Sequence, residues 1–88
     1  MDYHWNIDFG MTLRRLRKER NLSQEELAER SGLDRSYISL IERNLKLPGF
    51  ISILALASGL GMRASEFMIE IEKDQEFIPI NGYCGFTK

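Results

Sequence analysis

Hydrophobic residues near the start of the sequence recur every three or four positions, with basic residues between them. This spacing places an apolar face on a helix, here formed by Phe9, Leu13 and Leu16. Asn21 is expected to end this first helix. The tetrapeptide Ser-Gln-Glu-Glu at 23–26 then has the capping-box pattern, in which the serine and the last glutamate each bind the other's backbone amide. This pattern predicts that a second helix begins there.

A tight turn separates the second helix from a third. Gly32 is expected to end the second helix, because glycine adopts a left-handed conformation at little cost, and Asp34 is placed to cap the next one. The third helix is predicted over 34–43, with Ile38 and Ile41 directed inward. Two helices joined by three or four residues that include glycine have the spacing of a helix-turn-helix.

The second half of the sequence predicts two further helices, over about 50–60 and 64–73. The fourth helix is apolar nearly all round and therefore needs partners on more than one side. The residues assigned to the domain core are Phe50, Ile53, Leu56, Ala57 and Leu60. Those left in need of another partner are Ile51, Leu54 and Ala55. In the fifth helix, the residues expected to face inward are Phe67, Met68 and Ile71.

The two ends of the chain are aromatic. Six of the nine aromatic residues lie toward the ends: Tyr3, Trp5, Phe9, Phe77, Tyr83 and Phe86. Residues 77–80 read as a short extended piece, and Asn81-Gly82 reads as a turn. Such segments can cover the spare face of the fourth helix or a second subunit.

The composition describes one small globular domain. The chain has 88 residues, 43% hydrophobic and 28% charged, which are ordinary proportions for a folded protein. No run has the ~20 apolar residues of a membrane span, and residues 1–9 lack the positive charge of a secretory signal. These features predict a cytoplasmic protein without a membrane partner.

The sequence contains few residues suited to catalysis or metal binding. One cysteine, Cys84, and one histidine, His4, allow no intrachain disulfide, no cysteine-rich zinc cage and no convincing catalytic triad. We therefore expect no metal, no cofactor and no small-molecule ligand, and an enzyme is the least favoured class. Cys84 itself is expected to be a small apolar residue or an exposed thiol.

Charge is distributed unevenly along the chain. The net charge is −1, but residues 11–46 carry nine basic and six acidic side chains. The middle of the chain is therefore basic although the whole is not, and a phosphate partner responds to the local field. A solvated helix face is the plain alternative, and charge alone does not decide between the two.

Two adjoining stretches carry a family resemblance: LRRLRKERNLSQEELAERSG at 13–32 and LDRSYISLIERN at 33–44. Together they resemble the DNA-binding domain of lambda-repressor-like, Cro/C1-type (XRE-like) regulators. The resemblance implies an all-α fold, a compact five-helix bundle whose second and third helices form the helix-turn-helix. We place this domain at 9–72, with an N-terminal extension at 1–8 and a C-terminal extension at 73–88 that can serve dimerisation.

The resemblance implies that the third helix lies in the major groove. The base-reading residues it implies are Arg35, Ser36, Ser39 and Leu40. Arg35 has the strongest chemical case, because a guanidinium can donate twice to guanine; its alternative is a phosphate contact or a free surface arginine. The phosphate contacts it implies are Ser23, Gln24, Tyr37, Arg43, Asn44 and Lys46. Gln24 can instead be an ordinary exposed residue, and Tyr37 can simply pack its ring.

The resemblance also implies an ion pair between Arg17 and Glu42 that ties the first helix to the third. The chain departs from the family pattern where Gly49 and Arg63 replace polar helix caps, and in the apolar outer face of the fourth helix. We infer a homodimer interface at that face, formed by Ile51, Leu54 and Ala55. A terminal extension folded over the same face within one subunit is the alternative.

The function that these features favour is sequence-specific binding of double-stranded DNA by a homodimeric transcription regulator, such as a repressor, at an inverted-repeat operator. The second reading is a protein-interaction module, antitoxin-like, that keeps the fold but binds DNA weakly or without specificity. The basic middle of the chain favours DNA, whereas the aromatic ends favour a protein partner, which can be a second copy of the chain.

Overall fold

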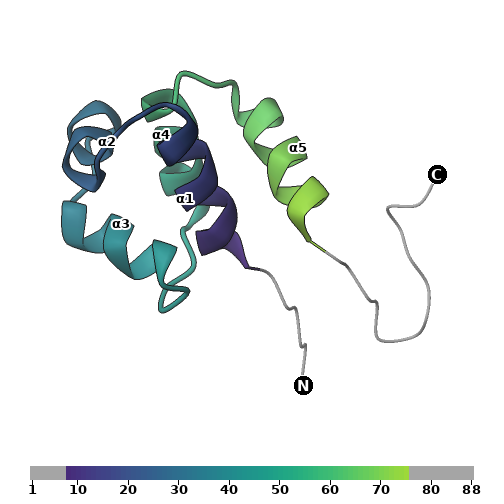
Figure 1. Ribbon diagram of the computed structural model, residues 1–88, viewed down its shortest axis with the longest axis horizontal. Helices are drawn as coiled ribbons and strands as arrows, with labels where there is room; N and C mark the ends of the chain where they lie inside the picture. Colours follow the sequence, from purple (N-terminus) through teal and green to yellow (C-terminus); the bar gives the residue numbers. More distant parts are fainter. Residues whose placement is uncertain (1–7, 76–88) are drawn as a thin grey trace.

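A computed structural model describes residues 8–75, and within that range the chain is all-helical. The five helices are α1 (Phe9–Glu19), α2 (Gln24–Ser31), α3 (Arg35–Glu42), α4 (Phe50–Gly59) and α5 (Ala64–Asp74). In Figure 1, α1 and α4 lie between the α2–α3 pair and α5. Helix α2 packs on both α3 and α4, while α1 packs on α3 and α5. The predicted fold class, a compact five-helix bundle with a helix-turn-helix, is confirmed.

The helix-turn-helix begins and ends at the predicted signals. The Ser23 hydroxyl oxygen accepts from the Glu26 amide at 3.0 Å, and the Glu26 carboxylate accepts from the Ser23 amide at 2.8 Å. Gly32 ends α2 with a φ of +76°, in the left-handed region. Asn21, also left-handed with a φ of +55°, follows the end of α1. The capping box and both stop signals are therefore confirmed.

The starts of α3, α4 and α5 have fewer capping hydrogen bonds. Asp34 occupies the N-cap position of α3, but its side chain makes no capping hydrogen bond, so the predicted cap is wrong in its chemistry. Gly49 before α4 provides no side-chain cap either. At α5 the Glu66 carboxylate accepts from the Arg63 amide at 2.9 Å, which supplies half of a capping box. Packing, more than capping, must hold α3 and α4 in place.

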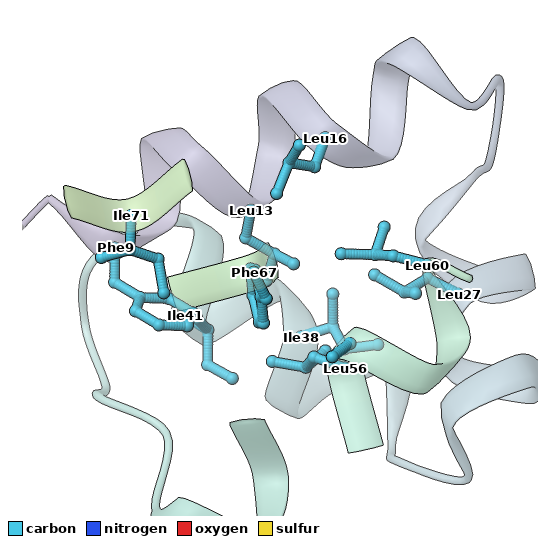
Figure 2. Close-up of a cluster of buried hydrophobic side chains, with 11 residues drawn as sticks. Phe9, Leu13, Leu16, Leu27, Ile38, Ile41, Leu56, Leu60, Phe67 and Ile71 are labelled. Atoms are coloured by element: carbon cyan, nitrogen blue, oxygen red, sulfur yellow. The ribbon is translucent and has the colours of Figure 1, made fainter. Parts of the chain in front are cut away.

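All five helices contribute to one hydrophobic core (Figure 2). Phe67 is fully buried and meets Phe9 edge-to-face, with ring centroids 5.5 Å apart. Such aromatic pairs add to the stabilisation from burial. The buried apolar residues are Phe9, Leu13, Leu16, Leu27, Ile38, Ile41, Leu56, Ala57, Leu60, Phe67 and Ile71.

Two residues assigned to the core from the sequence lie on the surface. Phe50 is 72% exposed and Met68 is 44% exposed. Phe50 is the first residue of α4, and on α5 the residue beside Met68, Phe67, is buried instead. For Phe50 the prediction failed because a helix that is apolar on every side has no periodicity to show which face is buried. For Met68 it failed because three consecutive apolar residues, 67–69, do not show which of them faces the core.

A glycine brings α1 into direct contact with the end of α3. A Cβ atom on Gly10 would lie 2.4 Å from the backbone carbonyl oxygen of Glu42 and 2.5 Å from that of Ile41. No larger residue fits there without moving one of the helices. Gly10 thus sets the separation between α1 and α3.

An ion-pair cluster joins α1 to the end of α5. Arg15 donates to Glu70 and to Asp74, each at 2.9 Å, and the Thr12 hydroxyl donates to Asp74 at 2.9 Å. Beside this cluster, the Asp8 amide donates to the Gln75 side-chain oxygen at 2.8 Å. These contacts extend beyond position 72, where we placed the domain boundary from the sequence.

Several expectations concern residues that the structure does not describe. The aromatic residues of segments 1–7 and 76–88, the extended piece at 77–80, the turn after it, and Cys84 all lie outside the described range. Within that range, no individual helix combines the length and apolar character needed to cross a membrane; α4 and α5 reach them only as a pair, bent by 100°.

Candidate nucleic-acid interface

Helix α3 offers a polar face to solvent. Ile38 and Ile41 are fully buried and fix the inner side of the helix. Arg35 and Ser36 are exposed at its start, while Ser39 and Leu40 are half-buried one turn later. Among residues 8–75, Arg35 has no ion pair or side-chain hydrogen bond. A guanidinium at the first residue of this helix is therefore free to bind another molecule.

Arg17 and Glu42 form a buried ion pair between α1 and α3. Arg17 Nε donates to Glu42 Oε2 at 2.6 Å, and its Nη2 donates to Oε1 at 2.9 Å. The bidentate contact raises the pKa of Arg17 above its ordinary value, and partial burial opposes the rise. The third guanidinium nitrogen donates to the Leu22 carbonyl at 2.8 Å. Each guanidinium nitrogen of Arg17 thus donates to a partner inside the protein.

Gln24 shares this ion pair, which the sequence did not indicate. Its side-chain nitrogen donates to Glu42 Oε1 at 3.0 Å, so one carboxylate oxygen accepts from both Gln24 and Arg17. One amide hydrogen of Gln24 remains for an outside acceptor. The first residue of α2 is therefore held by the same carboxylate that anchors α3.

Tyr37 joins α3 to α4. Its hydroxyl donates to the Ser52 hydroxyl oxygen at 3.0 Å, and its ring packs against the core. The Ser23 hydroxyl likewise accepts a hydrogen bond within its capping box, but its own hydrogen has no acceptor among residues 8–75. The hydroxyl hydrogen of Tyr37 is therefore used within the protein, whereas that of Ser23 is available to a phosphate.

Asn44 has a structural task at the end of α3. Its φ is +59°, and its side-chain oxygen accepts from the Gly10 amide at 3.0 Å while its nitrogen donates to Asp8. Asn44 thereby ties the start of α1 to the end of α3. Nearby, Arg43 and Lys46 are exposed and have no carboxylate partner in the described part of the chain.

The outer face of α4 is apolar and open. Ile51 is 72% exposed and Leu54 is 39% exposed, while Ala55 is half-buried. Phe50 extends this patch at the start of the helix. The structure therefore leaves the residues that we assigned to a subunit interface accessible to a partner.

Residues 8–75 hold no group of three or more histidine, cysteine, aspartate or glutamate side chains that can hold a metal ion.

Comparison with known proteins places these features in a family. The helix-turn-helix family profile matches residues 13–67. Control protein C.MunI from a Mycoplasma species is 41% identical over 69 residues, which cover 77% of this chain and 93% of that protein. The immunity repressor protein of Bacillus phage phi105 is 39% identical over 61 residues, covering 69% of this chain but 42% of the repressor.

A solved structure gives the same result. The restriction-modification controller protein C.AhdI from Aeromonas hydrophila is 44% identical with a TM-score of 0.65, covering 69% of this chain and 92% of that one. The profile, the identities and the shared helices agree. The chain therefore belongs to the Cro/C1-type helix-turn-helix family.

Proposed function

We propose that this protein is a transcription regulator that binds double-stranded DNA with sequence specificity. The observation that carries the proposal is Arg35, which opens α3 with an exposed guanidinium that no described residue engages. In helix-turn-helix proteins the first residues of this helix contact base edges in the major groove. The relatives named as repressors and control proteins support the same role.

Within this proposal, the candidate residues are grouped by the hydrogen-bond donors and charges that are not already used inside the protein. Arg35, Ser36, Ser39 and Leu40 face the bases. Backbone phosphates are bound by the exposed cations Arg43 and Lys46, by the free amide hydrogen of Gln24, and by the Ser23 hydroxyl. Tyr37 and Asn44 act mainly by holding α3 in place, because the Tyr37 hydroxyl donates to Ser52 and the Asn44 side chain joins Gly10 and Asp8. One amide hydrogen of Asn44 remains for a phosphate.

The apolar face of α4 supports a homodimer. Ile51 and Leu54 are exposed on the helix, with Ala55 beside them, and contiguous apolar surface of this kind marks interaction sites. A two-fold dimer would present two copies of α3 to half-sites about 34 Å apart, which favours an inverted-repeat operator. DNA as the partner favours a location in the cytoplasm, and binding alone, without catalysis, accounts for the role.

The experiment that tests this function selects duplexes from random DNA at about 150 mM salt, where binding that depends only on phosphate contacts is weak. The expected result is enrichment of an inverted repeat, and the loss of one base preference with Arg35→Ala. The matched control is Arg63→Ala, which removes an exposed arginine from the start of α5. Recovery of random sequence by the wild-type protein would overturn the proposal and favour the protein-interaction module.

A further inference from the structure

We propose that a hollow between α1 and the end of α3 binds phosphates of the DNA backbone, through Arg14 and Lys18 together with Arg43. The inference rests on the proposed function and extends the binding surface onto α1, beyond the helix-turn-helix. The hollow is open, with a volume of about 460 Å³, and these three cations line it.

The position of Gly10 explains why the cations of α1 lie beside α3. Gly10 contacts the end of α3, the position four residues further along lies on the same side of the helix, and the next position four residues on lies at the edge of that side. Those positions are Arg14 and Lys18. Arg43 is the residue that directly follows α3, and its side chain lines the opposite part of the hollow.

Three basic side chains that line the hollow have no carboxylate partner among residues 8–75. Within residues 8–75, Arg14 and Lys18 form no ion pair and no side-chain hydrogen bond, and Arg43 reaches only the Ser39 carbonyl, at 3.4 Å. Of the two acidic residues that line the hollow, Glu42 is neutralised by Arg17, while Asp8 accepts from the Met11 amide and from Asn44 and keeps its charge. Three unpaired cations outnumber this one carboxylate. The available chemistry is therefore that of an anion site.

A neighbour on the same helix provides the contrast. Arg15 lies next to Arg14 in sequence and also lines the hollow, yet it is held by Glu19, Glu70 and Asp74. Arg15 therefore joins helices, whereas the neighbouring Arg14 is exposed and free to bind an anion. Since Arg43 belongs both to the hollow and to the end of α3, a duplex docked on α3 is the anion within reach.

The test measures the affinity of the selected operator duplex against salt concentration for the wild type, Arg14→Gln, Lys18→Gln and the double variant. Each lost phosphate contact should lower the slope of log K against log salt by about one unit, without changing base preference. Ethylation of the operator phosphates that Arg14 and Lys18 contact should weaken binding by the wild type but not by the double variant. Arg63→Gln is the control and should leave the slope unchanged.

Three outcomes distinguish the phosphate site in the hollow from the proposed function as a whole. A slope lowered in both single variants, with thermal unfolding unchanged, supports the hollow as a phosphate site. A slope that changes no more than with Arg63→Gln, while the wild type still selects an operator, would overturn this inference and leave the proposed function standing. A wild type that binds no duplex would overturn both.

Discussion

The Tyr37 hydroxyl donates its only hydrogen to the Ser52 hydroxyl oxygen, 3.0 Å away, and so fastens α3 to α4. A phosphate oxygen can only accept hydrogen bonds, so Tyr37 can donate to a phosphate only when it stops donating to Ser52 and accepts from the Ser52 hydroxyl instead. The Ser52 hydroxyl, in contrast, keeps its own hydrogen. The docking of the candidate reading helix therefore depends on a contact with the helix behind it.

Tyr37→Phe is expected to lower the free energy of unfolding by about 1 kcal/mol, the net contribution of one hydrogen bond. It should leave the operator affinity at a fixed salt concentration nearly unchanged, because no contact to DNA is lost. Denaturant unfolding and an operator titration at one salt concentration measure the two effects. A clear loss of affinity without a change in the salt slope would mean that the uncharged hydroxyl turns to the DNA on binding.

Glu42→Ala is expected to destabilise the fold by about 3 kcal/mol, because it leaves the Arg17 guanidinium buried without its partner. Glu42 is also the acceptor for Gln24, so the variant frees the start of α2 as well. Denaturant unfolding measures the loss. The control is the double replacement Arg17→Met and Glu42→Leu, which removes both charges and should be less harmful than the single change. Equal losses in the two proteins would contradict a buried ion pair.

Gly10→Ala is expected to lower the free energy of unfolding by about 1–3 kcal/mol or more, the usual effect of overpacking. The added methyl meets backbone carbonyls, which cannot rotate away as a side chain can. Gly49→Ala is the matched control, because a Cβ there has no neighbour within 4 Å and the backbone conformation is an ordinary extended one. The thermal midpoints of the two variants decide the question.

Acid should weaken the joint between α1 and α5. A hydrogen bond from Arg15 lowers the pKa of Glu70 from its ordinary 4.5. Burial of Asp74 acts to raise its pKa, but hydrogen bonds from Arg15 and Thr12 outweigh burial and lower the pKa from 3.8. Carboxylates with a depressed pKa stabilise the fold above their unfolded values and lose that effect as the pH falls through the folded values.

The expected result is a thermal midpoint that is constant near neutral pH and drops below about pH 4.5 as these carboxylates take up protons. Arg15→Met removes the shared partner, so its midpoint should start lower and fall less steeply over the same range. Parallel curves for the two proteins would exclude the cluster as the cause.

Ile51→Glu or Leu54→Glu should weaken self-association more than about tenfold, as expected for a charge placed at the centre of an apolar interface. Sedimentation equilibrium without DNA measures the change. Ile51→Val keeps the apolar surface and should associate like the wild type. A wild type that is monomeric at all concentrations would favour the alternative, in which a terminal extension covers this face.

Sequence reasoning succeeded for most local signals, although the cap expected from the Asp34 side chain does not form. The capping box at Ser23 and the stop at Gly32 depend on residues within one turn of the chain, so a single sequence contains them. It failed at Phe50 and Met68, because the apolar character of α4 on every side and the run of apolar residues in α5 leave the buried face undetermined. The contacts of Asn44 with Asp8 and of Gln24 with Glu42 join residues far apart in sequence, and no local pattern predicts them.

The pairing of Asp8 with Gln75 has a consequence for engineering. The Asp8 amide donates to the Gln75 side chain, and the Gln75 nitrogen donates back to the Asp8 carbonyl at 3.2 Å. The first and last described residues of the helical core therefore lie side by side. A short linker can close the core into a ring, and a cut at an exposed turn would give a circular permutant with α3 still in place. The same neighbourhood allows the core to be inserted whole into a surface loop of another protein.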